Sequence, residues 1–274
     1  MTSPNFPDLR IQAPARWALD VEPALSTGPL HRQHLFGGAS LALAVAALEE
    51  VTGGDALWAS VHFLAPVPTG ATLDIEARIT GGGRAIGHGA VEARLDDVPI
   101  LSGLGSCGRA GGGDSGQWAQ MPATPPPADC DLLVAHKDAD RDIHSTLDIR
   151  VAAGRFGIFS RAPLAPGGRV QAWMRHRRRA NDRVALAFMS DFVPSTVGNA
   201  IGVRAGGNSL DNNIRYCGTG ETEWVLGDFS IDALSGGVGH GRVHLFAENG
   251  TLLATGSQSF KLRAMPRADE DRIG

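Results

Sequence analysis

Residues 36–51 read FGGASLALAVAALEEV, and this stretch decides the fold. Leu41, Val45 and Leu48 recur at the spacings of three and four residues that place side chains on one face of a helix. Most other positions carry alanine, glycine or another apolar residue, so the helix has almost no polar face. A helix that is apolar nearly all round is stable only where protein covers it on every side. The sequence therefore predicts a central helix that another layer of the chain wraps.

Four runs typical of β-strands follow this helix. Gly81-Gly82-Gly83 and Asp96-Asp97 supply tight turns of the kind that antiparallel hairpins need. The expected strands span residues 57–64, 71–80, 85–95 and 99–107, and an earlier extended piece at 17–24 is expected to complete the sheet. One helix packed on one side of a curved antiparallel sheet is an α+β layer arrangement.

The same order of elements returns after a break in the pattern. Residues 109–129 contain glycine and proline triplets and no apolar period, which is typical of a linker. The second half is expected to contain extended runs at 143–151 and 169–174, a helix at 182–193 ended by Pro194, and strands at 209–216, 223–233, 239–247 and 252–263. The sequence thus predicts an N-terminal domain at 1–108, the linker at 109–129, a C-terminal domain at 130–266 and a charged tail at 267–274.

The two halves also share residues at a constant offset. Gly87-His88-Gly89 recurs as Gly239-His240-Gly241, an offset of 239 − 87 = 152 residues. At the same offset Ile100-Leu101 meets Leu252-Leu253. Such self-similarity indicates a duplication. Two helices, each wrapped by a curved antiparallel sheet, form a double hotdog, in which one chain supplies what other hotdog proteins obtain from a homodimer.

The composition excludes several classes of function. Of the 274 residues 20% are charged, the net charge is −4, and no basic stripe of the kind that binds nucleic acid is present. The three cysteines lack the even number of a disulfide framework and the spacing of a metal site, so a reducing compartment is expected. The first residues lack a signal-peptide pattern, and no apolar run approaches the roughly 18 residues of a membrane helix. We therefore expect a soluble, cytoplasmic protein without a membrane partner.

Two pairs of histidines could be mistaken for metal ligands. His31 and His34 have no carboxylate or thiolate partner at a suitable spacing. His240 and His244 lie on a predicted strand, where four residues of rise separate them by about 13 Å. The sequence therefore predicts neither a metal site nor a cofactor. The basic run 175–179 leaves two interpretations open, a solvated strand end or a contact with phosphate groups such as those of coenzyme A.

Several short motifs, in this order and spacing, resemble the acyl-CoA thioesterase II family. His34-Leu35-Phe36-Gly37-Gly38 resembles the Phe-Gly-Gly segment at the start of that family's first helix. The second half contributes four further motifs, which are Trp173-Met174-Arg175, Ser190-Asp191, Ser209-Leu210-Asp211 and Ser257-Gln258. The resemblance covers the chain from about Pro14 to Arg263. It implies a double-hotdog fold and hydrolysis of an acyl-CoA to a free fatty acid and coenzyme A.

The resemblance also implies which residues carry the reaction. Thioester hydrolysis needs a water molecule that is oriented and partly deprotonated. We predict that Asp211, on a strand that resembles the family's catalytic strand, accepts the proton and that Gln258 and a hydroxyl orient the water. The family's catalytic Thr has no obvious counterpart, and Ser235 is the nearest hydroxyl. Asn212 stands where the family usually has His, which bears on acyl preference.

Gly37 and Gly38 are the predicted substrate-binding residues. Glycine at a helix start leaves backbone N–H groups open to a carbonyl oxygen. Gly38 is therefore expected to donate to the developing oxyanion and to face Asp211 across a site between the two halves. The alternative is that both glycines only let the buried helix pack closely.

The repeat supports a chemical role in the second half. An offset of 216 − 63 = 153 places Trp58 where the second half has Asp211, and the offset of 152 places Ser106 where it has Gln258. A residue needed for the framework would be expected in both copies, whereas chemistry is needed only once.

Other interpretations stay open. Asp211, Gln258 and Ser235 could be a solvated carboxylate, an outward strand residue and a turn residue. The protein could then be a catalytically silent acyl-CoA binder of the same fold, or a hydratase, although a hydratase needs His beside the carboxylate. The discriminating observation is whether the three side chains reach one shared point. Asp191 and Asp228 are the next candidates for the base, and a homo-oligomer is expected.

Overall fold

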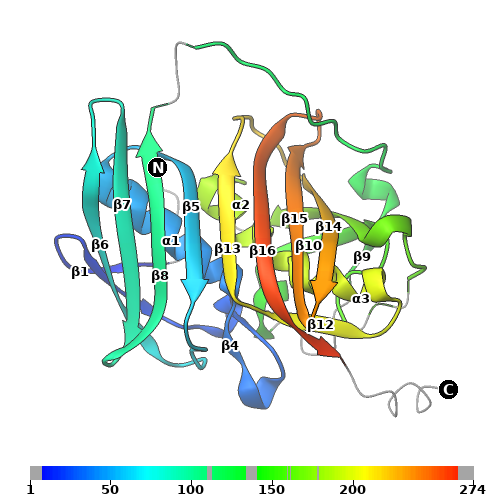
Figure 1. Cartoon of the computed structure of the whole chain (residues 1–274), viewed down its shortest axis with the longest axis horizontal. Helices are drawn as coiled ribbons and strands as arrows, with labels where there is room; N and C mark the ends of the chain where they lie inside the picture. Colours follow the sequence, from blue (N-terminus) through cyan, green and yellow to red (C-terminus); the bar gives the residue numbers. More distant parts are fainter. Residues whose placement is uncertain are drawn as a thin grey trace.

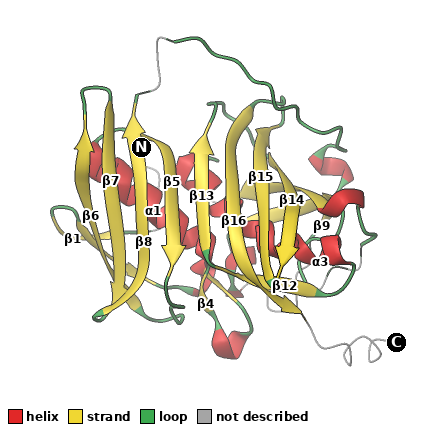
Figure 2. Ribbon diagram, in the orientation of Figure 1, coloured by secondary structure: helices red, strands yellow, loops and turns green. Residues whose placement is uncertain are grey.

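The computed structural model describes residues 8–109, 113–133, 141–158, 160, 162–177 and 179–264. Within them, fourteen strands form one antiparallel sheet that curves around the helices (Figures 1 and 2). The strands of the first half are β1 (Arg10–Ala13), β2 (Arg16–Asp20), β5 (Asp55–Phe63), β6 (Thr72–Gly82), β7 (Ile86–Leu95) and β8 (Val98–Gly108). A separate ribbon pairs β3 (Ser26–Thr27) with β4 (His34–Leu35).

The second half repeats this pattern. Its strands are β9 (Asp131–Leu132), β10 (Leu147–Ala153), β11 (Arg169–His176), β12 (Ala205–Ser209), β13 (Asp211–Tyr216), β14 (Val225–Ser235), β15 (Val238–Ala247) and β16 (Leu252–Ala264). The order across the sheet is β1-β2-β6-β7-β8-β5-β13-β16-β15-β14-β11-β10-β9, with β12 also on β16. The halves therefore meet at β5 and β13, where Asp211 pairs with His62 and Arg215 with Trp58. The predicted double-hotdog α+β fold is confirmed.

The predicted central helix is α1 (Gly37–Thr52). Leu41, Val45 and Leu48 have no exposed surface, as the apolar sequence of the helix predicts. The helix ends at Gly53, whose φ of 67° places it in the left-handed region and whose N–H donates to the carbonyl of Glu49. Glycine adopts this conformation without steric cost, which explains the stop.

The second helix differs from its prediction. The α-helical part, α2 (Arg183–Met189), stops before Pro194, and a 3₁₀ segment over Ser190–Thr196 leads into α3 (Val197–Ile201). Proline has no N–H and its ring collides with the preceding turn, so the chain cannot stay α-helical up to it. Asp191, with φ −88° and ψ 27°, lies inside this irregular stretch.

The helical stretch Arg183–Ile201 bears on the expectation that no segment is long and apolar enough to span a membrane. By length and composition these 19 residues could span a bilayer, with a mean hydropathy of 1.2. Yet 78% of the apolar window is buried inside the protein. A core helix meets the same criterion, and here the apolar side chains are used for packing.

The predicted linker lies against the second half along part of its length. Gln117 accepts from the N–H of Leu252 at 2.7 Å and donates to the carbonyl of Gly250 at 2.9 Å. Ala119 and Met121 pack with a small second core on the outer face of the sheet, formed by Cys130, Trp173, Trp224, Leu226 and Phe246. The linker therefore covers part of the outer face of the second half. The predicted tail, 267–274, falls outside the described residues.

Candidate active site

The two central helices pack antiparallel and side by side, with the start of α1 against the end of α2 and the end of α1 beside Arg183 at the start of α2. Both glycines at this start are needed for the contact. A Cβ atom at Gly38 would lie 2.3 Å from the carbonyl oxygen of Phe188, and one at Gly37 would lie 2.5 Å from Oδ2 of Asp191. The ring of Phe36 packs on Phe188 at a centroid distance of 5.0 Å. Close packing of this kind places a carboxylate directly at the first turn of α1.

Asp191 is the centre of a buried polar cluster. Only 4% of its surface is exposed. Its Oδ1 accepts a hydrogen bond from Nδ2 of Asn212 at 3.0 Å and another from Nε2 of Gln258. The hydroxyl of Ser209 and the N–H of Gly38 also bond the carboxylate. Gln258 further bonds Oγ of Ser209 at 2.7 Å, so the side chains form one connected network.

Burial sets the protonation of this carboxyl group. Desolvation raises the pKa of Asp191 from 3.8 to about 7, and the hydrogen bonds from Gln258, Asn212, Gly38 and Ser209 oppose the rise. The first-turn N–H groups of α1 add the partial positive charge of a helix start. The carboxyl group is therefore poised to exchange a proton near neutral pH, where a general base is most effective.

The structure does not bring the three predicted catalytic residues to one point. Gln258 lies in the cluster, but Asp211 accepts from the N–H of Ser259 at 2.7 Å and from its hydroxyl at 3.1 Å. Successive strand residues point to opposite faces, so Asn212 faces the helices and Asp211 faces away from them. Asn212 is 1% exposed and takes the inward place that Asp211 was expected to occupy.

Ser235 also lies elsewhere. It is exposed at the end of β14, where it pairs with Val238 across the hairpin turn. Val238 pairs in turn with Lys261, three residues beyond Gln258 and so about 10 Å along β16. The hydroxyl that reaches the cluster belongs to Ser209, at the end of β12.

The predicted partner of Gly38 was wrong, and the alternative of close packing holds for both glycines. Gly38 faces Asp191 rather than Asp211, and its N–H donates to that carboxylate. Since Gly37 and Gly38 belong to the first half and Asp191 to the second, the cluster does lie between the two halves.

The sequence contained partial signals for the residues that were missed. Ser190-Asp191 and Ser209 fall in motifs that resemble the family. The inward face of β13 is indicated by Ile214, which is fully buried and has the same parity as Asn212. Reading that parity would have placed Asn212, not Asp211, at the helices.

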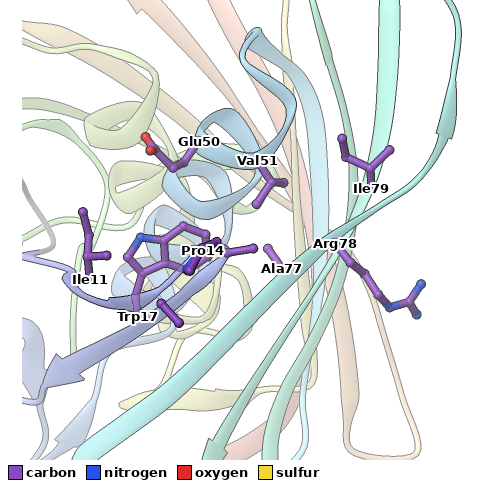
Figure 3. Close-up of a pocket in the computed structure, with 10 residues that line it drawn as sticks. Ile11, Pro14, Trp17, Glu50, Val51, Ala77, Arg78 and Ile79 are labelled. Atoms are coloured by element: carbon purple, nitrogen blue, oxygen red, sulfur yellow. The ribbon is translucent and has the colours of Figure 1, made fainter.

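A pocket lies apart from the polar cluster. A pocket of about 550 Å³ is lined by Ile11, Trp17, Glu50 and Arg78 among others (Figure 3). Glu50 is twelve residues along α1 from Gly38, about 18 Å at the helical rise, so this pocket is at the far end of the helix.

Within the described part of the chain, no three His, Cys, Asp or Glu side chains gather as a metal site.

The basic run 175–179 is neutralised by neighbouring carboxylates where it is described. Arg175 bonds Asp148 at 2.8 Å and also Glu223, Arg177 bonds Asp148 at 2.9 Å, and Arg179 bonds Asp182. Arginines paired in this way have few donors left for a phosphate group. The geometry favours the interpretation of a strand end over that of a phosphate site.

The fold and the buried carboxylate cluster between its halves define a double-hotdog protein with a candidate hydrolytic site. Residues 26–108 match the acyl-CoA thioesterase N-terminal domain, and residues 112–260 match the acyl-CoA thioesterase C-terminal domain. The chain belongs to this acyl-CoA thioesterase family. None of the curated proteins matches it in sequence.

Solved structures agree with this assignment. The chain is similar to a candidate thioesterase from Novosphingobium aromaticivorans DSM 12444, with 33% identity, a TM-score of 0.85, and coverage of 95% of this chain and 100% of that one. The acyl-CoA thioesterase II TesB2 of Mycobacterium marinum has the same fold, with 23% identity, a TM-score of 0.70 and coverage of 95% and 96%. So has the tesB protein of Mycobacterium avium subs paratuberculosis, with 19% identity, a TM-score of 0.74 and coverage of 93% and 96%.

Proposed function

We propose that the protein hydrolyses acyl-CoA thioesters and that Asp191 is the general base. Membership of the acyl-CoA thioesterase family supports the reaction class. The observation that carries the assignment of the base is the buried carboxyl group of Asp191, whose pKa of about 7 matches a base that works near neutral pH.

The proposed reaction is a direct attack by water. The water oxygen forms a bond to the thioester carbonyl carbon while one of its protons passes to the carboxylate of Asp191. The oxyanion that forms is stabilised by the partial positive charge at the start of α1. When the carbon–sulfur bond breaks, the protonated Asp191 returns the proton to the leaving thiolate. The products are a fatty acid and the free thiol of coenzyme A.

Gln258 keeps its predicted role in this proposal, and the roles of the base and of the hydroxyl are assigned to other residues. Gln258 orients the carboxylate and the water because its amide contacts Asp191 and Ser209 together. Ser209 replaces Ser235 as the hydroxyl, and Asp191 replaces Asp211 as the base. Asp211 is instead engaged by Ser259 on the outer face.

The alternative is a silent acyl-CoA binder, and one experiment separates the two. A panel of acyl-CoAs from acetyl to palmitoyl is incubated with the purified chain, and release of the thiol is followed with a chromogenic reagent. Turnover above the uncatalysed rate for at least one member supports the enzyme. Binding of the same acyl-CoAs by calorimetry without any turnover would establish the binder. The panel also identifies the preferred chain length.

We further propose that the chain self-associates and acts in the cytoplasm. The outer face of the first half carries exposed apolar side chains without the cover that the linker gives part of the second half, namely Ile86 and Leu104, which are 42% and 55% exposed. Uncovered apolar surface of this kind is typical of association sites. All three cysteines are free thiols, which suits a reducing compartment. Light scattering after gel filtration tests the first proposal, and localisation of a tagged chain tests the second.

A further inference from the structure

Two buried amide oxygens beside Asp191 accept no hydrogen bond from the described residues. They are Oδ1 of Asn212 and Oε1 of Gln258. The two residues are only 1% and 2% exposed, so bulk water does not reach them. A buried acceptor left without a donor costs free energy, and native proteins seldom tolerate it outside functional sites.

The direction of both amides is set by the carboxylate between them. Nδ2 of Asn212 and Nε2 of Gln258 donate to the same oxygen, Oδ1 of Asp191. Rotating either amide by 180° would place its oxygen against the carboxylate, which is repulsive once Asp191 is ionised. Asn213 pairs with Ser257, so Asn212 and Gln258 are direct neighbours across β13 and β16. The two unpartnered oxygens therefore flank the same carboxylate.

A hydrolytic water molecule can satisfy only one of these two oxygens. Water has two O–H bonds, and the reaction proposed above gives one of them to Asp191. The second fits Oε1 of Gln258, because that amide already links Asp191 and Ser209. Oδ1 of Asn212 is then still without a donor, and the remaining molecule in the site is the substrate.

We propose that Asn212 is a specificity-determining residue whose Oδ1 accepts a hydrogen bond from a donor group of the substrate close to the thioester. The inference rests on the proposed thioesterase function. Two parts of an acyl thioester can carry an O–H or N–H within a few bonds of the reacting carbonyl. One is a hydroxyl on the third carbon of the acyl chain, and the other is the first amide N–H of the thiol carrier.

The test compares pairs of substrates that differ by one donor. Wild type is assayed with 3-hydroxybutyryl-CoA against butyryl-CoA, and with the butyryl thioester of N-acetylcysteamine against that of butanethiol. The same four substrates are given to Asn212→Leu and to the matched control Asn213→Leu. Asn213 faces the outer surface and bonds Ser257, so its substitution changes the same strand without entering the cluster.

In wild type and in Asn213→Leu, kcat/KM should be about tenfold higher for the donor-bearing member of at least one pair, because one hydrogen bond contributes about this factor. The pair that shows this preference identifies the source of the donor. In Asn212→Leu the preference should fall to about twofold or less, because the hydrogen bond that causes it is gone. Loss of the bond from Nδ2 to Asp191 slows both members of a pair equally, so the ratio isolates the contact with Oδ1.

Two results would overturn the proposal. One is a wild type without preference in either pair. The other is an Asn212→Leu variant that slows all four substrates by one common factor and keeps the ratios, because Asn212 would then only position Asp191. If leucine prevents folding, Asn212→Ala gives the same comparison without added bulk. A wild type that hydrolyses none of the four thioesters, nor any acyl-CoA, would instead remove the proposed function itself.

Discussion

Gly37 and Asp191 are so close that a Cβ atom on the glycine would lie 2.5 Å from Oδ2 of the carboxylate. The two residues are 154 positions apart (191 − 37) and belong to different halves of the chain. The absence of one side chain in the first half therefore creates the space for a carboxylate of the second. This contact makes the site sensitive to the smallest possible substitution.

Gly37→Ala should displace the Asp191 carboxylate by about 1 Å, enough to cost on the order of 100-fold in kcat/KM. Overpacking of the buried helix contact should also lower the free energy of unfolding by about 1–3 kcal/mol. Thiol release and urea denaturation measure the two effects. Gly83→Ala is the matched control, because a Cβ atom there meets nothing within 4 Å. A Gly37→Ala variant as active as this control would show that Asp191 is not placed by the glycine.

Asp191→Asn and Asp211→Asn form a matched pair of carboxylate removals. An amide is nearly isosteric but cannot accept the proton, so Asp191→Asn should lose at least about 100-fold in kcat. Asp211→Asn should stay within a few-fold of wild type, because its carboxylate bonds only Ser259 among the contacts described. Initial rates of acyl-CoA hydrolysis measure both. The reverse pattern would restore Asp211 as the base.

The buried carboxyl group also predicts how stability changes with pH. The pKa of Asp191 is about 7 in the folded protein against an unperturbed value of 3.8. Between these values the folded state retains a proton that the unfolded chain has released, so stability falls as pH rises and reaches its lower level above pH 7. The total change is on the order of 4 kcal/mol at most, from about three units at 1.36 kcal/mol each.

Asp191→Asn carries no such titration and serves as the reference for this measurement. The free energy of unfolding of the variant minus that of wild type should increase from pH 5 to pH 8, as measured by urea denaturation at each pH. Over the same range kcat/KM of the wild type should rise, because the ionised carboxylate is the active form of the base. A stability difference that does not change with pH would contradict the raised pKa.

Ser209→Ala and Ser235→Ala test which hydroxyl belongs to the site. Ser209→Ala removes the oxygen that receives the Gln258 amide at 2.7 Å, so it should lower kcat by about tenfold or more, the loss expected when a buried partner is removed. Ser235 is exposed at a hairpin, and its substitution should leave kcat within about twofold of wild type, as is usual for surface changes. Thiol release from the preferred acyl-CoA is the assay. Equal effects of both changes would reject this assignment.

The sequence predicted the fold well because the fold depends on local patterns. The central helix, the hairpins and the repeat are all visible in short windows, and α1 matches its prediction to within one residue at each end. The site depends instead on strand register, and a shift of one residue moves a side chain to the other face of a sheet. That is why Asp211 was predicted inside and Asn212 is found there.

The comparison of the two halves was wrong for the same reason. An offset of 152 matched Ser106 with Gln258. In the structure Ser106 pairs with His88 as Ser259 pairs with His240, so the counterpart of Gln258 is Gly105. A bulge in a ladder changes the offset by one, and no local pattern reveals it.

Gly105 shows how the first half differs from the second. Cβ atoms placed at Gly105 and at Gly89 would lie 2.6 and 2.7 Å from the side chain of Leu48. A fully buried leucine thus fills the place that the second half gives to its polar cluster. The polar residues occur only once, and this single occurrence follows from how each half packs its helix.

The shared sheet, in which β5 and β13 join two halves of one polypeptide, has a consequence for evolution. In a symmetric pair of identical chains, every mutation appears twice, and an improvement at one end of the paired helices is imposed on the other end as well. Within one chain the two ends can vary independently. One end can then gain stability from a buried apolar side chain such as Leu48. The other end can keep a carboxylate that lowers the free energy of unfolding above neutral pH. A fused, duplicated chain can in this way assign stability to one end and catalysis to the other. A homodimer of identical short chains cannot do so.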